Sequence, residues 1–104
     1  MYLLCLSNGG FDGLGRIREK ELQLSGKNLG FKETICINDD DLQDGMANEW
    51  PEAVVADKVH RFLRSHQNKT FETIVTFDER GVSAHPNHIS VHKGVLRVLM
   101  LGQF

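Results

Sequence analysis

The segment Tyr2-Leu-Leu-Cys-Leu6, followed at once by Ser7-Asn-Gly-Gly10, decides the class of fold. A short apolar run that ends in Ser, Asn and Gly is typical of a buried strand that enters a loop. Residues 16–29 are rich in Glu, Lys, Leu and Gln and stop before Gly30, as expected of a helix and its end. The chain therefore opens with a strand, a loop and a helix.

This pattern occurs twice more. The sequence predicts strands at 34–37 and 73–77, loops at 38–50 and 78–85, and helices that start at Pro51 and Pro86. The last helix is apolar over much of its circumference, so we expect it to be well buried. The alternation predicts an α/β fold with a parallel sheet and flanking helices. The three loops at the carboxyl ends of the strands would then share one edge, where such folds bind ligands.

Composition sets the limits of this interpretation. The chain has 104 residues, of which 40% are apolar and 25% are charged, which suits one small α/β domain or part of a larger one. The formal net charge is −2, so the chain has no excess of positive charge of the kind that favours binding to nucleic acid. No apolar run has the length of a membrane span. Cys5 and Cys36 lie in apolar runs and are interpreted as buried thiols of a reducing compartment rather than a disulfide.

The segment His85-Pro-Asn-His88 is the most informative for chemistry. It follows a strand and a loop and opens a helix, so residues three apart share one face. Two imidazoles there can hold a metal or move a proton, or they can simply cap and pack. His92 forms a second pair with His88 at i, i+4, but the Glu of helical zinc motifs is missing. We therefore interpret His92 as a packing or surface residue.

Two other segments are candidates for binding. An arginine within 16–21, directly after the glycine-rich loop 8–15, could bind a phosphate or sugar hydroxyls, although most such clusters are solvated faces. The loop itself suits anion binding at a helix start. The acidic run 39–41 departs from the spacing of a calcium-binding EF-hand. We expect this acidic run to lie at the edge of the site, with one of its Asp side chains in contact with the substrate.

Several of these segments together resemble a known family. Leu6-Ser-Asn-Gly9, Arg18-Glu-Lys-Glu-Leu22 and Leu29-Gly30 resemble the LmbE-like deacetylases, and the segment Thr76-Phe-Asp-Glu-Arg-Gly-Val-Ser-Ala-His-Pro-Asn-His88 is the most specific part. Within that group the chain is most similar to the eukaryotic enzymes that remove acetate from N-acetylglucosaminyl-phosphatidylinositol, the second step of GPI-anchor synthesis.

The resemblance implies a Rossmann-like fold and a catalytic zinc. His88 would be a zinc ligand, and His85 would stabilise the oxyanion or protonate the departing amine. Arg18 would bind substrate, and Asp41 is a further match to a substrate-site carboxylate. The other zinc ligands and the general base of the family come from an amino-terminal His-Pro-Asp-Asp motif.

No His-Pro-Asp-Asp motif occurs in this sequence. We therefore expect residues 1–104 to be a single partial catalytic domain, inactive alone, whose other ligands and membrane anchor lie in a missing amino-terminal segment. The family would place it at the cytosolic face of the endoplasmic reticulum membrane. Two alternatives stay open: a non-catalytic sugar-phosphate-binding or regulatory fragment of the same fold, and a small nucleotide- or phosphate-binding module.

Overall fold

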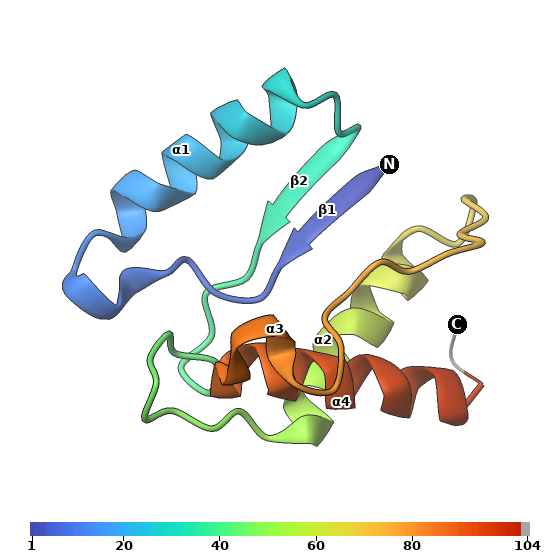
Figure 1. Ribbon diagram of the computed structural model, residues 1–104. Coiled ribbons are helices and arrows are strands. Elements are labelled where there is room, and N and C mark those ends of the chain that lie inside the picture. Colours follow the sequence, from blue (N-terminus) through green and yellow to red (C-terminus); the bar gives the residue numbers. More distant parts are fainter. Residues whose placement is uncertain (103–104) are drawn as a thin grey trace. The chain divides into compact units, whose positions relative to one another are not determined.

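The structure is a computed structural model that describes residues 1–102. It divides into two compact units, Met1–Gly45 and the part of the chain from Met46 onward (Figure 1). The first unit contains a parallel sheet and the second is helical. Within residues 1–102, no helix combines the length and apolarity that a membrane crossing requires.

The first unit is a strand–helix–strand motif. Its elements are β1 Tyr2–Cys5, the short 3₁₀ helix η1 Gly10–Asp12, α1 Gly15–Asn28 and β2 Glu33–Cys36. The two strands pair in parallel from Tyr2 opposite Glu33 to Cys5 opposite Cys36, as Figure 1 shows. The predicted class, α/β with a parallel sheet and flanking helices, is confirmed. Both strands are only partly buried, however, because α1 is the one helix of this unit that covers the sheet.

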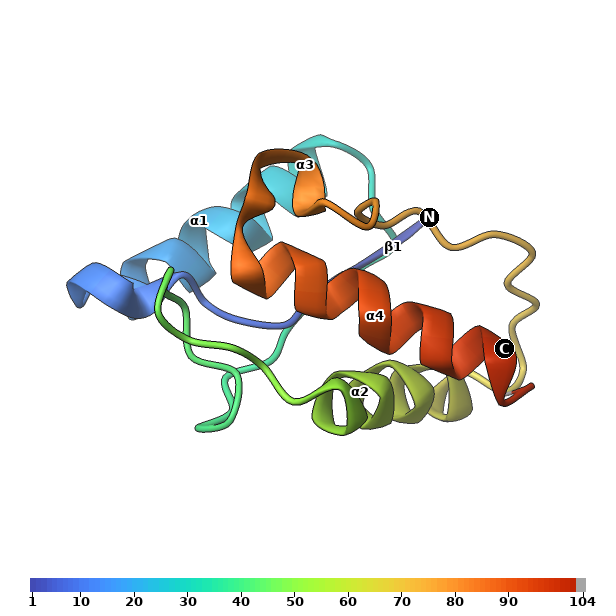
Figure 2. The same cartoon turned by 60° about the horizontal axis from the view of Figure 1, so that its bottom comes forward.

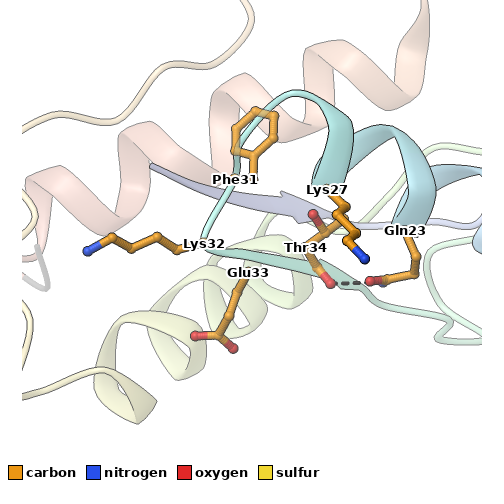
Figure 3. Close-up of a pocket in the computed structure, with 6 residues that line it drawn as sticks. All are labelled: Gln23, Lys27, Phe31, Lys32, Glu33 and Thr34. Carbon is orange, nitrogen blue, oxygen red and sulfur yellow. Dashed lines mark hydrogen bonds between the residues drawn. The ribbon is translucent and has the colours of Figure 1, made fainter.

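A glycine sets the close approach of α1 to β2. A Cβ added at Gly26 would lie 2.9 Å from the Cβ of Thr34. Gln23 Nε2 also donates a hydrogen bond of 2.8 Å to the Thr34 carbonyl (Figure 3). A surface hollow beside this contact is lined by Gln23, Lys27, Phe31, Lys32, Glu33 and Thr34. It lies at the amino end of β2, the opposite end from the edge where parallel sheets bind ligands.

The second unit is built on two long helices. They are α2 Glu52–Ser65 and α4 Pro86–Met100, with the short α3 Gly81–Ala84 just before α4. The long helices pack side by side (Figure 2). The buried residues of this contact are apolar and small: Val55, Ala56 and Val59 of α2, and Gly94, Val95 and Val98 of α4. A Cβ added at Gly94 would lie 2.6 Å from the Cβ of Val55, so this glycine allows the close contact.

The third strand predicted at 73–77 is wrong, since these residues carry no strand. Val75 is 87% exposed. A short β-branched run becomes a strand only when a neighbour completes its hydrogen-bond ladder. Among residues 46–102 no strand is present to pair with it, and the carbonyl of Phe77 is within hydrogen-bond distance, 2.9 Å, of the His92 ring instead.

The last helix also differs from its prediction. α4 has the expected bounds, but it is buried along one face rather than around most of its circumference. Leu96 and Leu99 are 45% exposed and Met100 is 78% exposed. Apolar content alone overestimated burial, because α2 covers only one face of the helix.

Candidate active site

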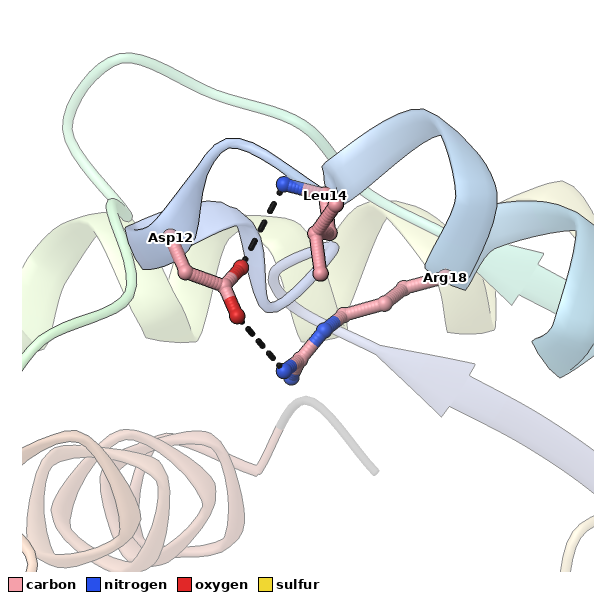
Figure 4. Close-up of polar contacts among 3 residues, drawn as sticks. All are labelled: Asp12, Leu14 and Arg18. Atoms are coloured by element: carbon pink, nitrogen blue, oxygen red, sulfur yellow. Dashed lines mark hydrogen bonds and ion pairs between the residues drawn. The ribbon is translucent and has the colours of Figure 1, made fainter.

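Arg18 reaches back from α1 over the loop that follows β1. Its guanidinium forms an ion pair of 3.2 Å with Asp12, whose carboxylate also accepts the N–H of Leu14 at 3.3 Å (Figure 4). A Cβ added at Gly9 would lie 3.1 Å from Arg18 Nη1, so the loop approaches the arginine closely where it turns through a φ of +64°. Arg18 therefore lies beside the loop at the carboxyl end of β1, the edge at which parallel sheets commonly bind ligands.

The Arg18 ion pair is exposed to solvent. The side chains of Arg18 and Asp12 are 49% and 46% exposed. Exposed ion pairs stabilise proteins by about 0–1 kcal/mol, so an anionic ligand could displace this contact at small cost. Arginine has five N–H donors, which leaves capacity for a phosphate or for hydroxyl groups.

Asp41 lies in the loop that follows β2. Its N–H donates to Asp39 Oδ1 at 2.8 Å, which closes a tight turn, and the residue is exposed. The next residue, Leu42, is 1% exposed and anchors the loop. Because β1 and β2 are parallel, the loops near Arg18 and Asp41 both leave the carboxyl edge of the sheet.

In the second unit, His85 caps the start of α4. The N–H of Asn87 donates to His85 Nδ1 at 3.2 Å, and Pro86 occupies the first turn. The rings of His85 and His88 stack with centroids 4.5 Å apart and an angle of 19° between their planes. The prediction that the two motif histidines share one face at a helix start is confirmed.

The ring of His88 is held from two further sides. Its Nδ1 lies 3.2 Å from the carbonyl oxygen of Gly81. Phe77 stacks on its other face, with centroids 4.1 Å apart and planes 3° from parallel. Phe77, His88 and His85 thus form a stack of three rings within the second unit.

The hydrogen bonds of the two histidines select opposite tautomers. A carbonyl oxygen only accepts, so a neutral His88 ring that makes this contact carries its proton on Nδ1 and has its lone pair on Nε2. His85 Nδ1 accepts an N–H, so its neutral ring carries the proton on Nε2. In these neutral forms the two motif histidines present different atoms at Nε2, a lone pair on His88 and an N–H on His85.

The predicted loop 78–85 contains a tight turn, whose geometry the sequence did not reveal, that supports this arrangement. Asp78 Oδ1 accepts the N–H groups of Arg80 and Val82 at 3.1 and 3.0 Å. The turn includes the short element α3, whose backbone is not regularly helical: φ is positive at Gly81, Val82 and Ala84, with values of 61°, 68° and 61°. The pattern of an Asp three residues before a Gly was a usable signal for a turn. The hydrogen bond from this turn to His88 was not readable from the sequence.

Substituting Gly81 by Ala should displace His88. The added Cβ would lie 2.9 Å from His88 Cβ and 2.9 Å from the N of Ile89, at a φ that Ala adopts with strain. We expect a loss of about 1–3 kcal/mol in the free energy of unfolding. Long-range proton–nitrogen NMR spectra should lose the Nδ1–H form of His88. Ser83→Ala, at an exposed position of the same turn, serves as the control. An unchanged His88 tautomer in Gly81→Ala would contradict the role of this carbonyl.

Asn87 of the motif, and His92 one turn further along α4, have packing roles. Asn87 is 2% exposed, and its Nδ2 donates to the carbonyl of Asn48 at 2.6 Å. His92 Nδ1 lies 2.9 Å from the Phe77 carbonyl, which agrees with its interpretation as a packing residue. Within residues 1–102, no group of three or more His, Cys, Asp or Glu side chains is arranged to hold a metal ion.

The fold and the histidine pair define an α/β protein with paired imidazoles at a helix start. A family model described as PIG-L, GlcNAc-PI de-N-acetylase, matches residues 1–99, and the chain belongs to this family. The resemblance drawn from the Thr-Phe-Asp and His-Pro-Asn-His segments is thereby confirmed, together with the LmbE-like α/β fold that it implied.

Individual relatives agree with the family match. A probable N-acetylglucosaminyl-phosphatidylinositol de-N-acetylase of Schizosaccharomyces pombe is 38% identical over 101 residues, covering 95% of this chain and 40% of the relative. A protein of the same name from Dictyostelium discoideum is 36% identical, and the match covers 95% of this chain and 38% of that relative. The N-acetylglucosaminyl-phosphatidylinositol de-N-acetylase of Saccharomyces cerevisiae is 33% identical, and the match covers 93% of this chain and 32% of that relative. The chain thus spans at most about 40% of the length of these relatives. No solved structure matches it significantly.

Proposed function

We propose that this chain contributes to a hydrolase that removes the acetyl group from N-acetylglucosaminyl-phosphatidylinositol. Water would cleave the amide bond to give acetate and the free amine of the sugar. Membership of the family and the names of the relatives support this reaction. By the same resemblance, the reaction belongs to GPI-anchor biosynthesis, at the cytosolic face of the endoplasmic reticulum membrane.

The observation that carries the proposal is the pair of opposite tautomers. Amide hydrolysis needs a group that activates the carbonyl or the water and a donor that stabilises the oxyanion. His88, with its lone pair on Nε2, suits the first task as a metal ligand. His85, with its proton on Nε2, suits the second.

Zinc is the metal we propose. A neutral imidazole whose other nitrogen donates to a carbonyl is a common zinc ligand, and the Gly81 carbonyl provides that support for His88. When bound, zinc would supply Lewis acidity toward the amide and the attacking water. The stack with Phe77 fixes the plane of the His88 ring and limits its rotation.

His85 would act on the oxygen of the amide during the reaction. Its cap contact with Asn87 fixes the ring, so the Nε2–H donor does not have to reorganise when negative charge develops. By the family resemblance, Arg18 and Asp41 are proposed to hold the sugar-phosphate part of the substrate. The exposed guanidinium of Arg18 suits a phosphate or sugar hydroxyls.

A chimera tests the proposed function. This chain replaces the matching 101-residue segment of the S. pombe relative, and acetate release from N-acetylglucosaminyl-phosphatidylinositol is measured beside the parent protein. We expect activity within about tenfold of the parent, a difference in barrier of about 1.4 kcal/mol. A folded chimera that binds the substrate and releases no acetate would favour the non-catalytic alternative. The thermal unfolding curve of the chimera establishes that it is folded.

Arg18→Ala in this chimera should weaken substrate use. We expect kcat/KM to fall about 10–100-fold, as for the loss of a charge-assisted hydrogen bond of about 1.5–3 kcal/mol. The melting temperature should change little, because the ion pair with Asp12 is exposed. Arg16→Ala, at an exposed position of the same helix, is the matched control. Equal kinetics in the two variants would assign Arg18 to the solvated face of α1.

A further inference from the structure

Cys5 and Cys36 lie side by side at the carboxyl ends of the two strands. They are direct partners in the parallel register and are the two cysteines of the chain. In-register residues of neighbouring parallel strands place their side chains on the same face of the sheet. Both thiols are free and partly buried. No step of the proposed deacetylation uses them.

The spacing of the strands suits a bridge through one atom better than a disulfide. Neighbouring strands lie about 4.7–4.9 Å apart, and the Cβ atoms of in-register residues are separated by about the same distance. A disulfide needs a Cβ separation of about 3.5–4.5 Å, so the strands would have to move together. An atom with bonds of about 2.3 Å to each sulfur, the length of a zinc–thiolate bond, spans a wider gap without this movement.

The surroundings keep the pair in its thiol form. Burial raises the pKa of Cys5. Burial, and then the neighbouring Cys5 and Glu19, raise the pKa of Cys36. Cys36 Sγ lies 3.5 Å from the Ser7 carbonyl and 3.8 Å from that of Ile37, so its S–H can act as a weak donor. Reagents that need a thiolate should therefore react slowly near neutral pH.

We propose that Cys5 and Cys36 form a dithiol site for thiophilic metalloid centres, with trivalent organoarsenicals as its ligand class. Both S–H bonds and the arsenic–oxygen bond of R–As=O break, and two As–S bonds form. The oxygen leaves as water with the two thiol protons. Arsenic stays trivalent throughout, so no oxidant or reductant is required.

The probe is phenylarsine oxide, added to the full 104-residue chain and followed by intact mass. We expect one arsenical per chain, retained against excess glutathione and released by a dithiol such as 2,3-dimercaptopropanol. Chelation should strengthen retention about 100-fold or more over a single As–S bond. Cys5→Ser and Cys36→Ser should each lose this retention while keeping the circular dichroism spectrum of the parent.

Thermal unfolding separates the folded site from simple capture by an unfolded chain. A ligand that binds the folded state raises the melting temperature, whereas one that prefers the unfolded chain lowers it. We expect a rise of several degrees in the parent and none in the single variants. A fall in melting temperature, two arsenicals per chain, an arsenical that joins two chains, or equal retention by a single-cysteine variant would each overturn the proposal.

Discussion

Replacing His88 by Ala in the chimera with the S. pombe relative is expected to abolish both zinc binding and acetate release. His85→Ala should keep the zinc and lower kcat by about 10²–10³-fold, the usual effect of removing one oxyanion donor. The two histidines stack on each other, so a nonspecific disturbance of the helix start would affect both variants in the same way. A variant that keeps its zinc but loses turnover, beside one that loses both, would show that the two histidines have different roles.

Zinc per chain, measured by atomic spectroscopy, and acetate release decide this prediction together. His92→Gln is the matched control, since His92 stands one turn further along α4 and contacts the Phe77 carbonyl. It should retain zinc and most of the turnover. Normal zinc content in His88→Ala would falsify the ligand assignment, and zinc loss in His92→Gln would favour the i, i+4 pair of His88 and His92.

Replacing Gly94 by Ala should destabilise the second unit, although the same change stabilises most helices. Ala has a helix propensity better than that of Gly by about 1 kcal/mol. Here the new Cβ would lie 2.6 Å from Val55 Cβ and 3.2 Å from the backbone N of Ala56, so α2 and α4 would have to move apart. Overpacking of this kind costs about 1–3 kcal/mol. The melting temperature of the chain should fall by roughly 4–8 °C per kcal/mol.

A double-mutant cycle isolates the clash. Val55→Ala alone should destabilise the chain by leaving space in the buried contact. Combined with Gly94→Ala, it should restore part of the lost stability, because the space and the added methyl group offset each other. Lys93→Ala, exposed on the same helix, is the control for helix propensity. Additive losses in the double variant would show that the two helices do not meet at Gly94.

The sequence predicted the elements that local chemistry determines. The glycine after residues 16–29 and the prolines at 51 and 86 marked helix ends that agree with α1, α2 and α4 within a residue or two. The position of His85 at the helix start followed from Pro86. The strand predicted at 73–77 failed because pairing depends on a neighbour, which a single segment does not reveal.

The candidate site was predictable as a set of residues but not as an arrangement. The segment His85-Pro-Asn-His88 pointed to chemistry through its spacing. The tautomers that separate the two histidines depend on the N–H of Asn87 and the carbonyl of Gly81. The Gly81 carbonyl belongs to a turn in which Val82 has a positive φ, a backbone conformation that β-branched residues rarely adopt. Local patterns therefore could not have specified which histidine presents a lone pair.

The left-handed turn before α4 has a consequence for local opening. Val82 and Ala84 each hold a conformation that costs about 1–3 kcal/mol. The N–H of Val82 donates to Asp78, and that of Ala84 donates to the Arg80 carbonyl, and these hydrogen bonds retain the conformation. We expect a segment that carries such a cost to open locally, and to exchange its amide hydrogens, at a lower free energy than that of unfolding the whole domain. The turn is thus a weak point placed directly against His88. Any fluctuation that releases it would remove the carbonyl partner of the imidazole while α2 and α4 stay folded.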